Sequence, residues 1–311
     1  MAITISINNL PRAITCAEND QVVAICLLYG SAHAARGAAE DIAYVVRRLR
    51  EVWPNVRIHV RGDTGFAVPR MYETCERLEV LYSIGIGMNA RLKKYSESLL
   101  HEAVQRFEET GQSQRLFCAF WYRADTWPAQ RWVVLKCEAN AQGTNRRAVV
   151  TNRPGAKVLP EAAYDAYAER GESENRNKEL KGGLQADRLS DHRYFANLFR
   201  LYLHTAAYHL LVRMRQQVVD PPPRDPHEPL AAEALAGRRR HQYHNRRREH
   251  DPLGQGQPCT WRTRLIKVAA CVFETTRRVV VQLSCSWPYL KHFERVSQQI
   301  FTATQPSFDT S

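Results

Sequence analysis

A chain of 311 residues is long enough for about two domains, or for one large domain, at roughly 150 residues per domain. Lys and Arg number 44 against 32 Asp and Glu, and the resulting net charge of +12 favours a polyanionic partner. A hydrophobic fraction of 44% excludes an intrinsically disordered chain. The eight cysteines include no C-x-x-C pair, which excludes a zinc site of that kind and favours a reducing cytoplasm. The sequence predicts neither a signal peptide nor a membrane span.

Apolar runs and helical periodicity alternate through the first third of the chain. Residues 21–29 are continuously apolar, which predicts a buried strand. Apolar residues then recur at helical spacing over 34–53, where Pro54 ends the helix. Residues 56–60 alternate with period two and lead to Asp63, completing the strand, helix and strand crossover of an α/β sheet. The elements expected next are a helix at 69–79, a strand at 80–87 and a long charged helix at 89–111.

The pattern changes after residue 115, where strand-like segments follow one another without a helix between them. This succession indicates an antiparallel insertion, with strands at 116–124, 131–139 and 146–153. The elements expected after it are helices at 160–181 and 194–216, a Pro-rich and Arg-rich linker, a hairpin with strands at 263–273 and 278–284, and a helix at 289–301.

Four residues with reactive side chains recur at helical spacing within the predicted helix 160–181. Their offsets are i, i+3, i+7 and i+14, so on a continuous helix they would project within an arc of about 60°. The residues are Tyr167, Arg170, Glu174 and Lys181. The alternative interpretation is an ordinary surface face with salt bridges between neighbouring turns.

The spacing Y-x2-R-x3-E-x6-K is the signature of a large group of DDE-type transposases of bacterial insertion sequences, and this sequence resembles that group beyond the signature. The further matching positions are 53–66 with Asp63-Thr64-Gly65, the strand from Tyr82 with Asn89, 149–152, Asn175, Lys178, Glu179, Asp187, Arg188 and Asn197. The resemblance implies DNA transposition of a mobile element: metal-dependent cleavage of transposon ends, followed by strand transfer.

The resemblance also implies a fold, namely a ribonuclease-H-like mixed sheet with helices on both faces and an antiparallel β insertion before the helix that carries the catalytic Glu. The expected segments are an unassigned N-terminal segment (1–19), the first part of the core (20–115), the β-rich insertion (116–155), the catalytic-Glu helix with the second part of the core (156–218), the Pro/Arg-rich linker (219–258) and a C-terminal hairpin and helix (259–311).

By the same resemblance, Asp63 and Glu174 are the expected catalytic residues and metal ligands. Phosphodiester cleavage by in-line attack uses two divalent ions, and Mg²⁺ or Mn²⁺ prefers hard oxygen ligands such as carboxylates. Tyr167, Arg170 and Lys181 would bind phosphates of the transposon-end DNA. From the residues alone, Asp63 before Thr-Gly is also typical of a turn.

The first Asp of the DDE set is missing from its expected place. The resemblance puts it on the first strand, and three strands, a helix and their connections need upwards of roughly 45 residues before the second Asp. Upstream of Asp63 only Asp20 and Asp41 are available, and neither fits that spacing. We therefore expect an N-terminally truncated chain that begins after the first strand and has an incomplete active site. The alternative is a catalytically inactive DNA-binding remnant, and a third hypothesis, an RNA-associated protein, rests on charge alone.

The expected partners are double-stranded DNA, both transposon ends and target, and a second copy of the chain in a homodimeric synaptic complex, with no membrane. A cytoplasmic, nucleoid-associated location follows. Trp127 and Trp132 in the β insertion could stack on a flipped base or pack in the core. The six Arg between residues 238 and 248 could contact phosphates or belong to a solvated linker.

Overall fold

The computed structural model describes residues 1–7, 11–29, 32–33, 35–153, 158–218 and 258–304. It divides into two compact units, each of which combines two stretches of the chain. The core unit consists of Met1–Asn177 and Leu189–Leu201, and the C-terminal unit consists of Lys178–Arg188 and Tyr202–Ser311.

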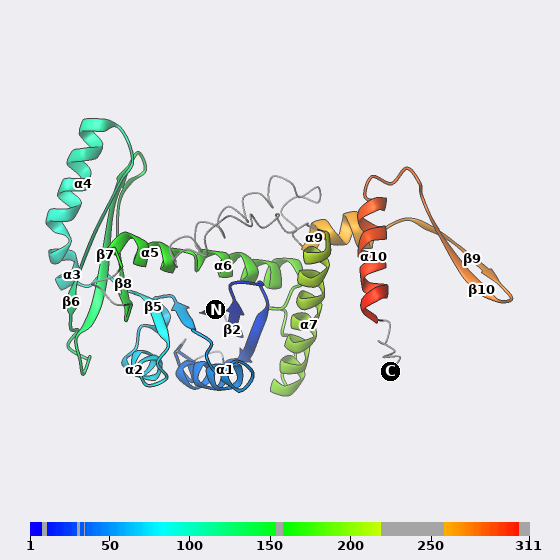
Figure 1. Cartoon of the computed structure of the whole chain (residues 1–311), viewed down its shortest axis with the longest axis horizontal. Helices are drawn as coiled ribbons and strands as arrows, with labels where there is room; N and C mark the ends of the chain where they lie inside the picture. Colours follow the sequence, from blue (N-terminus) through cyan, green and yellow to red (C-terminus); the bar gives the residue numbers. More distant parts are fainter. Residues whose placement is uncertain (8–10, 30–31, 34, 154–157, 219–257, 305–311) are drawn as a thin grey trace. The chain divides into compact units, whose positions relative to one another are not determined.

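The core unit is built on an eight-stranded mixed sheet with the order β3-β2-β1-β4-β5-β8-β7-β6 (Figure 1). The strands are β1 (Ala2–Ile7), β2 (Pro11–Cys16), β3 (Val22–Leu27), β4 (His59–Gly62), β5 (Leu81–Ile86), β6 (Gln114–Tyr122), β7 (Arg131–Asn140) and β8 (Gly143–Thr151). β4 pairs in parallel with β1 on one side and β5 on the other, whereas the remaining neighbours are antiparallel. The predicted α/β architecture with a mixed sheet is confirmed.

Three of these strands lie in the first 27 residues, so the expectation that the sheet lacks its first strand is wrong. β1 and β2 form a hairpin in which Ile5 pairs with Ile14. A tight turn joins β2 to β3, where Asp20 has a φ of 61° and the Cys16 amide donates to the Gln21 carbonyl at 2.8 Å. Residues 1–19 contain a short segment in which Ile alternates with Thr and Ser. This period-two pattern is typical of a strand, but it contains no long apolar run.

Helices cover both faces of the sheet. One face carries α1 (Ala38–Val52), α2 (Pro69–Arg77), α3 (Ala90–Tyr95) and α4 (Glu97–Thr110), and the other carries α5 (Pro160–Ala168). Because side chains alternate along a strand, Val133 of β7 packs in the cluster that contains the α1 and α2 residues, whereas Val134 packs with Tyr164 and Tyr167 of α5. The predicted helices 34–53 and 69–79 are confirmed as α1 and α2, and the predicted long helix 89–111 divides at Ser96.

Strands β6, β7 and β8 extend the core sheet. The three strands are antiparallel, as predicted, and β8 pairs with β5 so that Ser83 lies opposite Thr151. Buried Arg131 of β7 donates to both carboxylate oxygens of Glu76 on α2, at 2.8 and 3.0 Å, and its guanidinium lies 5.0 Å from the ring centroid of Tyr72. The segment predicted as an insertion is therefore tied to the core by strand pairing and by an ion pair.

The predicted helix 160–181 is interrupted, contrary to expectation. Its residues form α5, α6 (Gly171–Lys178) and a π-helical turn, η2 (Glu179–Gly183), with Glu169 and Arg170 between α5 and α6. Gly171 at the start of α6 is a weak helix former, which accounts for a break at this place. The tight 3-10 turn η1 (Thr64–Phe66) follows β4.

The helix α7 (Tyr194–Val218) begins in the core unit and ends in the C-terminal unit. The C-terminal unit also holds α9 (Pro258–Trp261), the π-helical turn η3 (Arg262–Ile266), β9 (Ala270–Thr275), β10 (Arg278–Leu283) and α10 (Leu290–Thr304). Its buried cluster consists of Leu211, Trp261, Leu265 and Val296. The predicted C-terminal hairpin and helix are present, but the strand predicted at 263–273 is wrong over its first half, where η3 lies, and β9 begins only at Ala270. Residues 219–257 of the predicted linker lie outside the described residues. Among the helices that the structure describes, none is long and apolar enough to cross a membrane.

Candidate functional site

Asp63 directly follows the carboxyl end of the central strand β4. Its carboxylate Oδ1 accepts a hydrogen bond from the Gly65 amide at 2.8 Å and thereby caps η1. Asp63 is partly buried and two residues beyond Arg61, so the two side chains share one face of β4. Asp63 thus acts as a turn residue. It also lies at the carboxyl end of β4, where the resemblance places a metal ligand.

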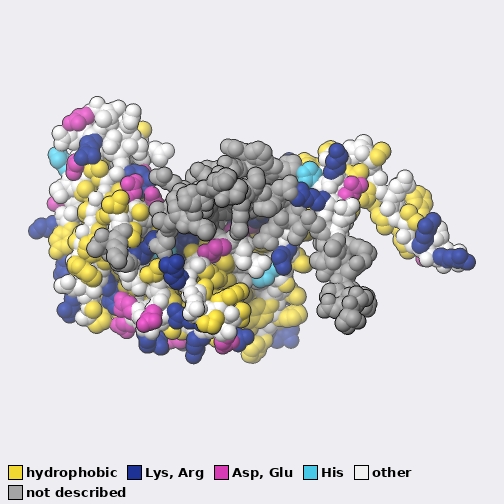
Figure 2. Space-filling view, viewed as in Figure 1, with side chains coloured by type: hydrophobic (Ala, Val, Ile, Leu, Met, Phe, Trp, Pro, Cys, Tyr) yellow, Lys and Arg dark blue, Asp and Glu magenta, His cyan; other side chains and the backbone are white. Residues whose placement is uncertain are grey.

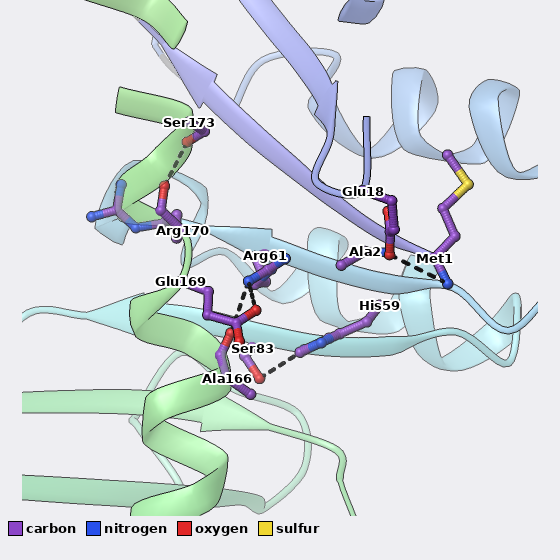
Figure 3. A network of polar contacts seen from close by, with 10 residues as sticks. All are labelled: Met1, Ala2, Glu18, His59, Arg61, Ser83, Ala166, Glu169, Arg170 and Ser173. Carbon is purple, nitrogen blue, oxygen red and sulfur yellow. Dashed lines mark hydrogen bonds and ion pairs between the residues drawn. The ribbon is translucent and has the colours of Figure 1, made fainter. Parts of the chain in front are cut away.

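Arg61 fixes the end of α5 on this face of the sheet. Its side chain is only 1% exposed, and its guanidinium NH1 donates to the Ala166 carbonyl at 3.0 Å and to Glu169 Oε2 at 2.9 Å (Figure 3). The Ala166 carbonyl belongs to the last turn of α5, where helical carbonyls lack partners within the helix. Arg61 therefore holds the junction between α5 and α6 against β4.

His59 adds a neutral group to the same face. Its Nε2 lies 3.0 Å from Ser83 Oγ on β5 (Figure 3). Burial lowers the pKa of His59 to about 3, and the nearby charges of Arg61, Arg153 and the N-terminal amino group act in the same direction. His59 is consequently an uncharged hydrogen-bonding residue at neutral pH rather than a cation.

Tyr167 of α5 is buried against the sheet and only 7% exposed. Its hydroxyl approaches β5 at Gly85 so closely that a Cβ on that residue would lie 2.4 Å from the hydroxyl oxygen. The ring also packs edge-on against Tyr164, with 5.8 Å between the ring centroids. The absence of a side chain at Gly85 is therefore what admits the Tyr167 ring.

Arg170 joins the predicted site residues electrostatically. Its NH2 forms an ion pair with Glu174 Oε1 at 2.9 Å, and its guanidinium carbon lies 5.6 Å from the Tyr167 ring centroid. Burial lowers the pKa of Arg170, but Tyr167, Glu174 and Asp63 raise it by more, so its net pKa is above the usual value. We call Asp63, Tyr167, Arg170 and Glu174 the Arg170 cluster. In it, two carboxylates act on one guanidinium.

Lys181 lies in η2 of the C-terminal unit and is not part of the Arg170 cluster. The 60° arc predicted for the four signature residues assumed an unbroken helix, and the interruption at Glu169 and Arg170 removes that basis. The structure thus brings three of the four signature residues together, and it adds Asp63 to them.

The Arg170 cluster has two carboxylates, and a third is not found where the fold would supply it. β1, the neighbour of β4, has the sequence AITISI and contains no Asp or Glu. Asp20 pairs with Arg176 Nε at 3.3 Å, and Asp41 of α1 pairs with Arg12. Within the described ranges, no group of three or more His, Cys, Asp or Glu is arranged to hold a metal ion. These residues do not fit a two-metal site, which needs ligands for ions about 3.5–4 Å apart.

Sequence reasoning missed two residues that shape the site, Arg61 and Gly85. Arg61 could have been noticed as a charged residue inside a short strand. Gly85 could have been noticed as a Gly inside a strand, which often marks the close approach of another group. Of the two Trp weighed for base stacking, Trp127 is 5% exposed and packs edge-on against Tyr72 at 5.3 Å, which is core packing. Trp132 packs against the exposed Trp121, with ring centroids 5.4 Å apart.

Comparison with known proteins gives one family. A family model described as the transposase DDE domain, group 1, matches residues 15–224, about two thirds of the chain. The match includes β3 to β8, α1 to α6 and the whole Arg170 cluster. No curated protein matches the chain.

Proposed function

The chain belongs to the family of transposase DDE domains, group 1, and from this premise we propose that it binds transposon-end DNA with a metal site that lacks one carboxylate. Its eight-stranded mixed sheet with helices on both faces is the ribonuclease-H-like fold of these transposases. Membership of the family assigns the protein in general to DNA transposition. The completeness of the active site and its use of metal belong to the proposal.

The observation that carries the proposal is the ion pair between Arg170 and Glu174 beside Asp63. Asp63 and Glu174 are the proposed ligands for a single Mg²⁺ or Mn²⁺ ion. Cleavage with two metal ions would need a second ion, for which the described residues offer no third carboxylate in this cluster. The guanidinium of Arg170, 2.9 Å from Glu174, opposes a second cation at that carboxylate. With no acidic residue on β1, we expect weak metal binding and no cleavage.

Binding of DNA is supported by charge. The chain has a net charge of +12, and a guanidinium matches the geometry of a phosphate. Arg170 and Lys181 are the proposed phosphate contacts. The hydroxyl of Tyr167 lies close to Gly85 of β5, and we propose that its ring positions the guanidinium of Arg170 through the contact between them. A homodimer in a complex with two transposon ends is the proposed assembly.

The second candidate function is residual metal-dependent cleavage. It is favoured by the presence of Asp63 and Glu174 in one cluster on the expected side of the sheet. Loss of the ion pair with Arg170 on DNA binding would free Glu174 for a metal ion.

Nicking and binding assays on transposon-end DNA separate these functions. We expect wild type and Glu174→Gln to give the same background nicking in Mg²⁺ and in Mn²⁺, while both bind the duplex in a salt-sensitive manner. Arg170→Ala should lower affinity and reduce the slope of log K against log salt by about 0.9. Nicking by wild type that is absent in Glu174→Gln would refute the incomplete site and establish the second function. Absence of DNA binding would refute both.

A further inference from the structure

A groove runs between α1 and α2 on the face of the sheet opposite α5. Its floor is made of small residues, and its rim of long cationic ones. The floor residues are Ala39, Ala43 and Thr74, and the rim arginines are Arg47, Arg70 and Arg77. We call this feature the α1–α2 groove. Figure 2 shows Lys and Arg side chains, with some acidic ones, along the lower border of the view, where Figure 1 places α1 and α2.

The charge of the α1–α2 groove is positive. Glu40 is its one acidic lining residue, and it forms an ion pair with Arg70. Arg47 donates a hydrogen bond to the Ala43 carbonyl of its own helix, at 3.3 Å. In the part of the chain that the structure describes, neither Arg47 nor Arg77 has a carboxylate partner. Exposed guanidiniums that line one groove repel each other, and a bound anion relieves that repulsion.

The arrangement of the rim fits a row of phosphates better than one isolated anion. Arg70 and Arg77 are seven residues apart on α2, which places them about 10 Å apart along the helix axis. That length equals the rise of about three base pairs along the axis of a DNA duplex, at 3.4 Å each. Thr74 lies between them on the same side, and its small side chain leaves room for a backbone to lie against the helix.

The α1–α2 groove and the Arg170 cluster lie on opposite sides of the sheet. Arg61 and Asp63 point toward α5, whereas Val60 of the same strand packs under α1. The sheet and the α1–α2 layer therefore separate the α1–α2 groove from the Arg170 cluster within the core unit. A straight duplex bound at one site does not reach the other.

We propose that the α1–α2 groove binds the sugar–phosphate backbone of a second DNA duplex, through Arg47, Arg70 and Arg77. The proposal rests on the proposed function for the first duplex at the Arg170 cluster. The backbone contacts carry no base specificity, so any duplex sequence is accepted. The full chain would then bridge two DNA molecules across one sheet.

A capture assay tests the proposal with the full chain. A biotinylated transposon-end duplex is immobilised, protein is added, and retention of a fluorescent duplex of unrelated sequence is measured. The groove variant is Arg47→Ala with Arg77→Ala. Its matched control, Arg48→Ala with Arg106→Ala, removes the same charge from exposed positions on α1 and α4 that are not in the groove.

We expect the groove variant to bind the immobilised duplex as wild type does and to capture the second duplex about tenfold less well, with a salt slope lower by about 1.8. The control should capture it normally. Equal capture by the groove variant and the control overturns the proposal. All four arginines are exposed, so unchanged melting temperatures are expected and are measured alongside.

Two further arms identify the source of failure. In the first arm, Arg170→Ala is compared with the groove variant. If Arg170→Ala loses the immobilised duplex and the groove variant loses only the second duplex, both sites are supported. Arg170→Ala without effect, together with loss of all binding in the groove variant, refutes the proposed function of the cluster and leaves the groove as the DNA site. In the second arm, inorganic phosphate is added and the melting temperature is measured. If phosphate stabilises wild type but not the groove variant, and no second duplex is captured, DNA is overturned as the ligand and the groove is assigned to a free phosphate.

Discussion

Replacement of Arg61 by Met tests whether the α5–α6 junction depends on one buried guanidinium. The substitution removes two hydrogen bonds, to the Ala166 carbonyl at 3.0 Å and to Glu169 at 2.9 Å, while keeping much of the side-chain volume. Glu169 loses its ion pair with Arg61, and the Ala166 carbonyl of α5 loses the hydrogen bond from Arg61. We expect the junction to loosen and Arg170 to lose its position beside Asp63.

The magnitude follows from the burial of the two partners. Removal of one member of a fully buried ion pair costs about 3–5 kcal/mol. Arg61 is 1% exposed, but Glu169 is 31% exposed, so its carboxylate keeps contact with water after Arg61 is removed. We therefore expect a lower cost, about 2–3 kcal/mol, which at about 2–4 °C per kcal/mol lowers the melting temperature by about 4–12 °C.

Calorimetry of wild type, Arg61→Met, Glu169→Gln and the double variant measures this energy. The double-mutant cycle should give a coupling of about 1–3 kcal/mol between the two residues. DNA affinity should fall in Arg61→Met as it does in Arg170→Ala, because both remove the guanidinium of Arg170 from its place. A destabilisation below about 0.5 kcal/mol, the usual range for surface substitutions, would refute the reasoning.

Three other predictions concern the packing of the core unit. Gly85→Ala places a Cβ 2.4 Å from the Tyr167 hydroxyl and should destabilise the protein by about 1–3 kcal/mol. Addition of Tyr167→Phe should recover part of this loss in thermal melts. No recovery would contradict the contact. Arg131→Met should lower the free energy of unfolding by about 2–3 kcal/mol, because Arg131 is 4% exposed and forms an ion pair with Glu76, which is 38% exposed. Chemical denaturation measures this loss, and an unchanged midpoint would contradict it. Burial raises the pKa of Glu76, but hydrogen bonds from Arg131 and Tyr82 lower it by more, so its net pKa is below the usual range. A carboxyl of this kind stabilises the folded chain above its unfolded pKa, so stability should fall as the pH drops below about 4.3, more steeply in wild type than in Glu76→Gln; parallel curves for the two proteins would refute this.

The order of the core elements from β3 to β8 was predictable because most of them have a strong local period. The amphipathic pattern of 34–53 and the apolar run before Gly87 gave α1 and β5 within a few residues. The three strands after residue 115 were also expected. Their pairing with β5 was not, since a pattern of alternating residues does not specify the neighbouring strand.

The candidate site was predictable in its residue types and less so in its geometry. The spacing of Tyr167, Arg170 and Glu174 selected three residues that lie together in the structure, although the helix that carries them is interrupted. The contact of Arg61 with Glu169 joins residues 108 positions apart, and no local pattern indicates it. The first strands were missed because short segments with Thr and Ser lack the long apolar run of a buried strand.

The pairing of β5 with β8 has a consequence for synthesis of the chain. Ser83 and Thr151 are 68 residues apart, and at about 5–20 residues per second the ribosome needs about 3–14 s to make the intervening segment. During that time β5, with the sequence LYSIGI, has one edge without a partner strand. An apolar edge of this kind can pair with another chain. Chaperone binding or a lower growth temperature should therefore raise the yield of folded protein. The expected reason is protection of the unpaired β5 edge during synthesis rather than a change in the stability of the finished sheet.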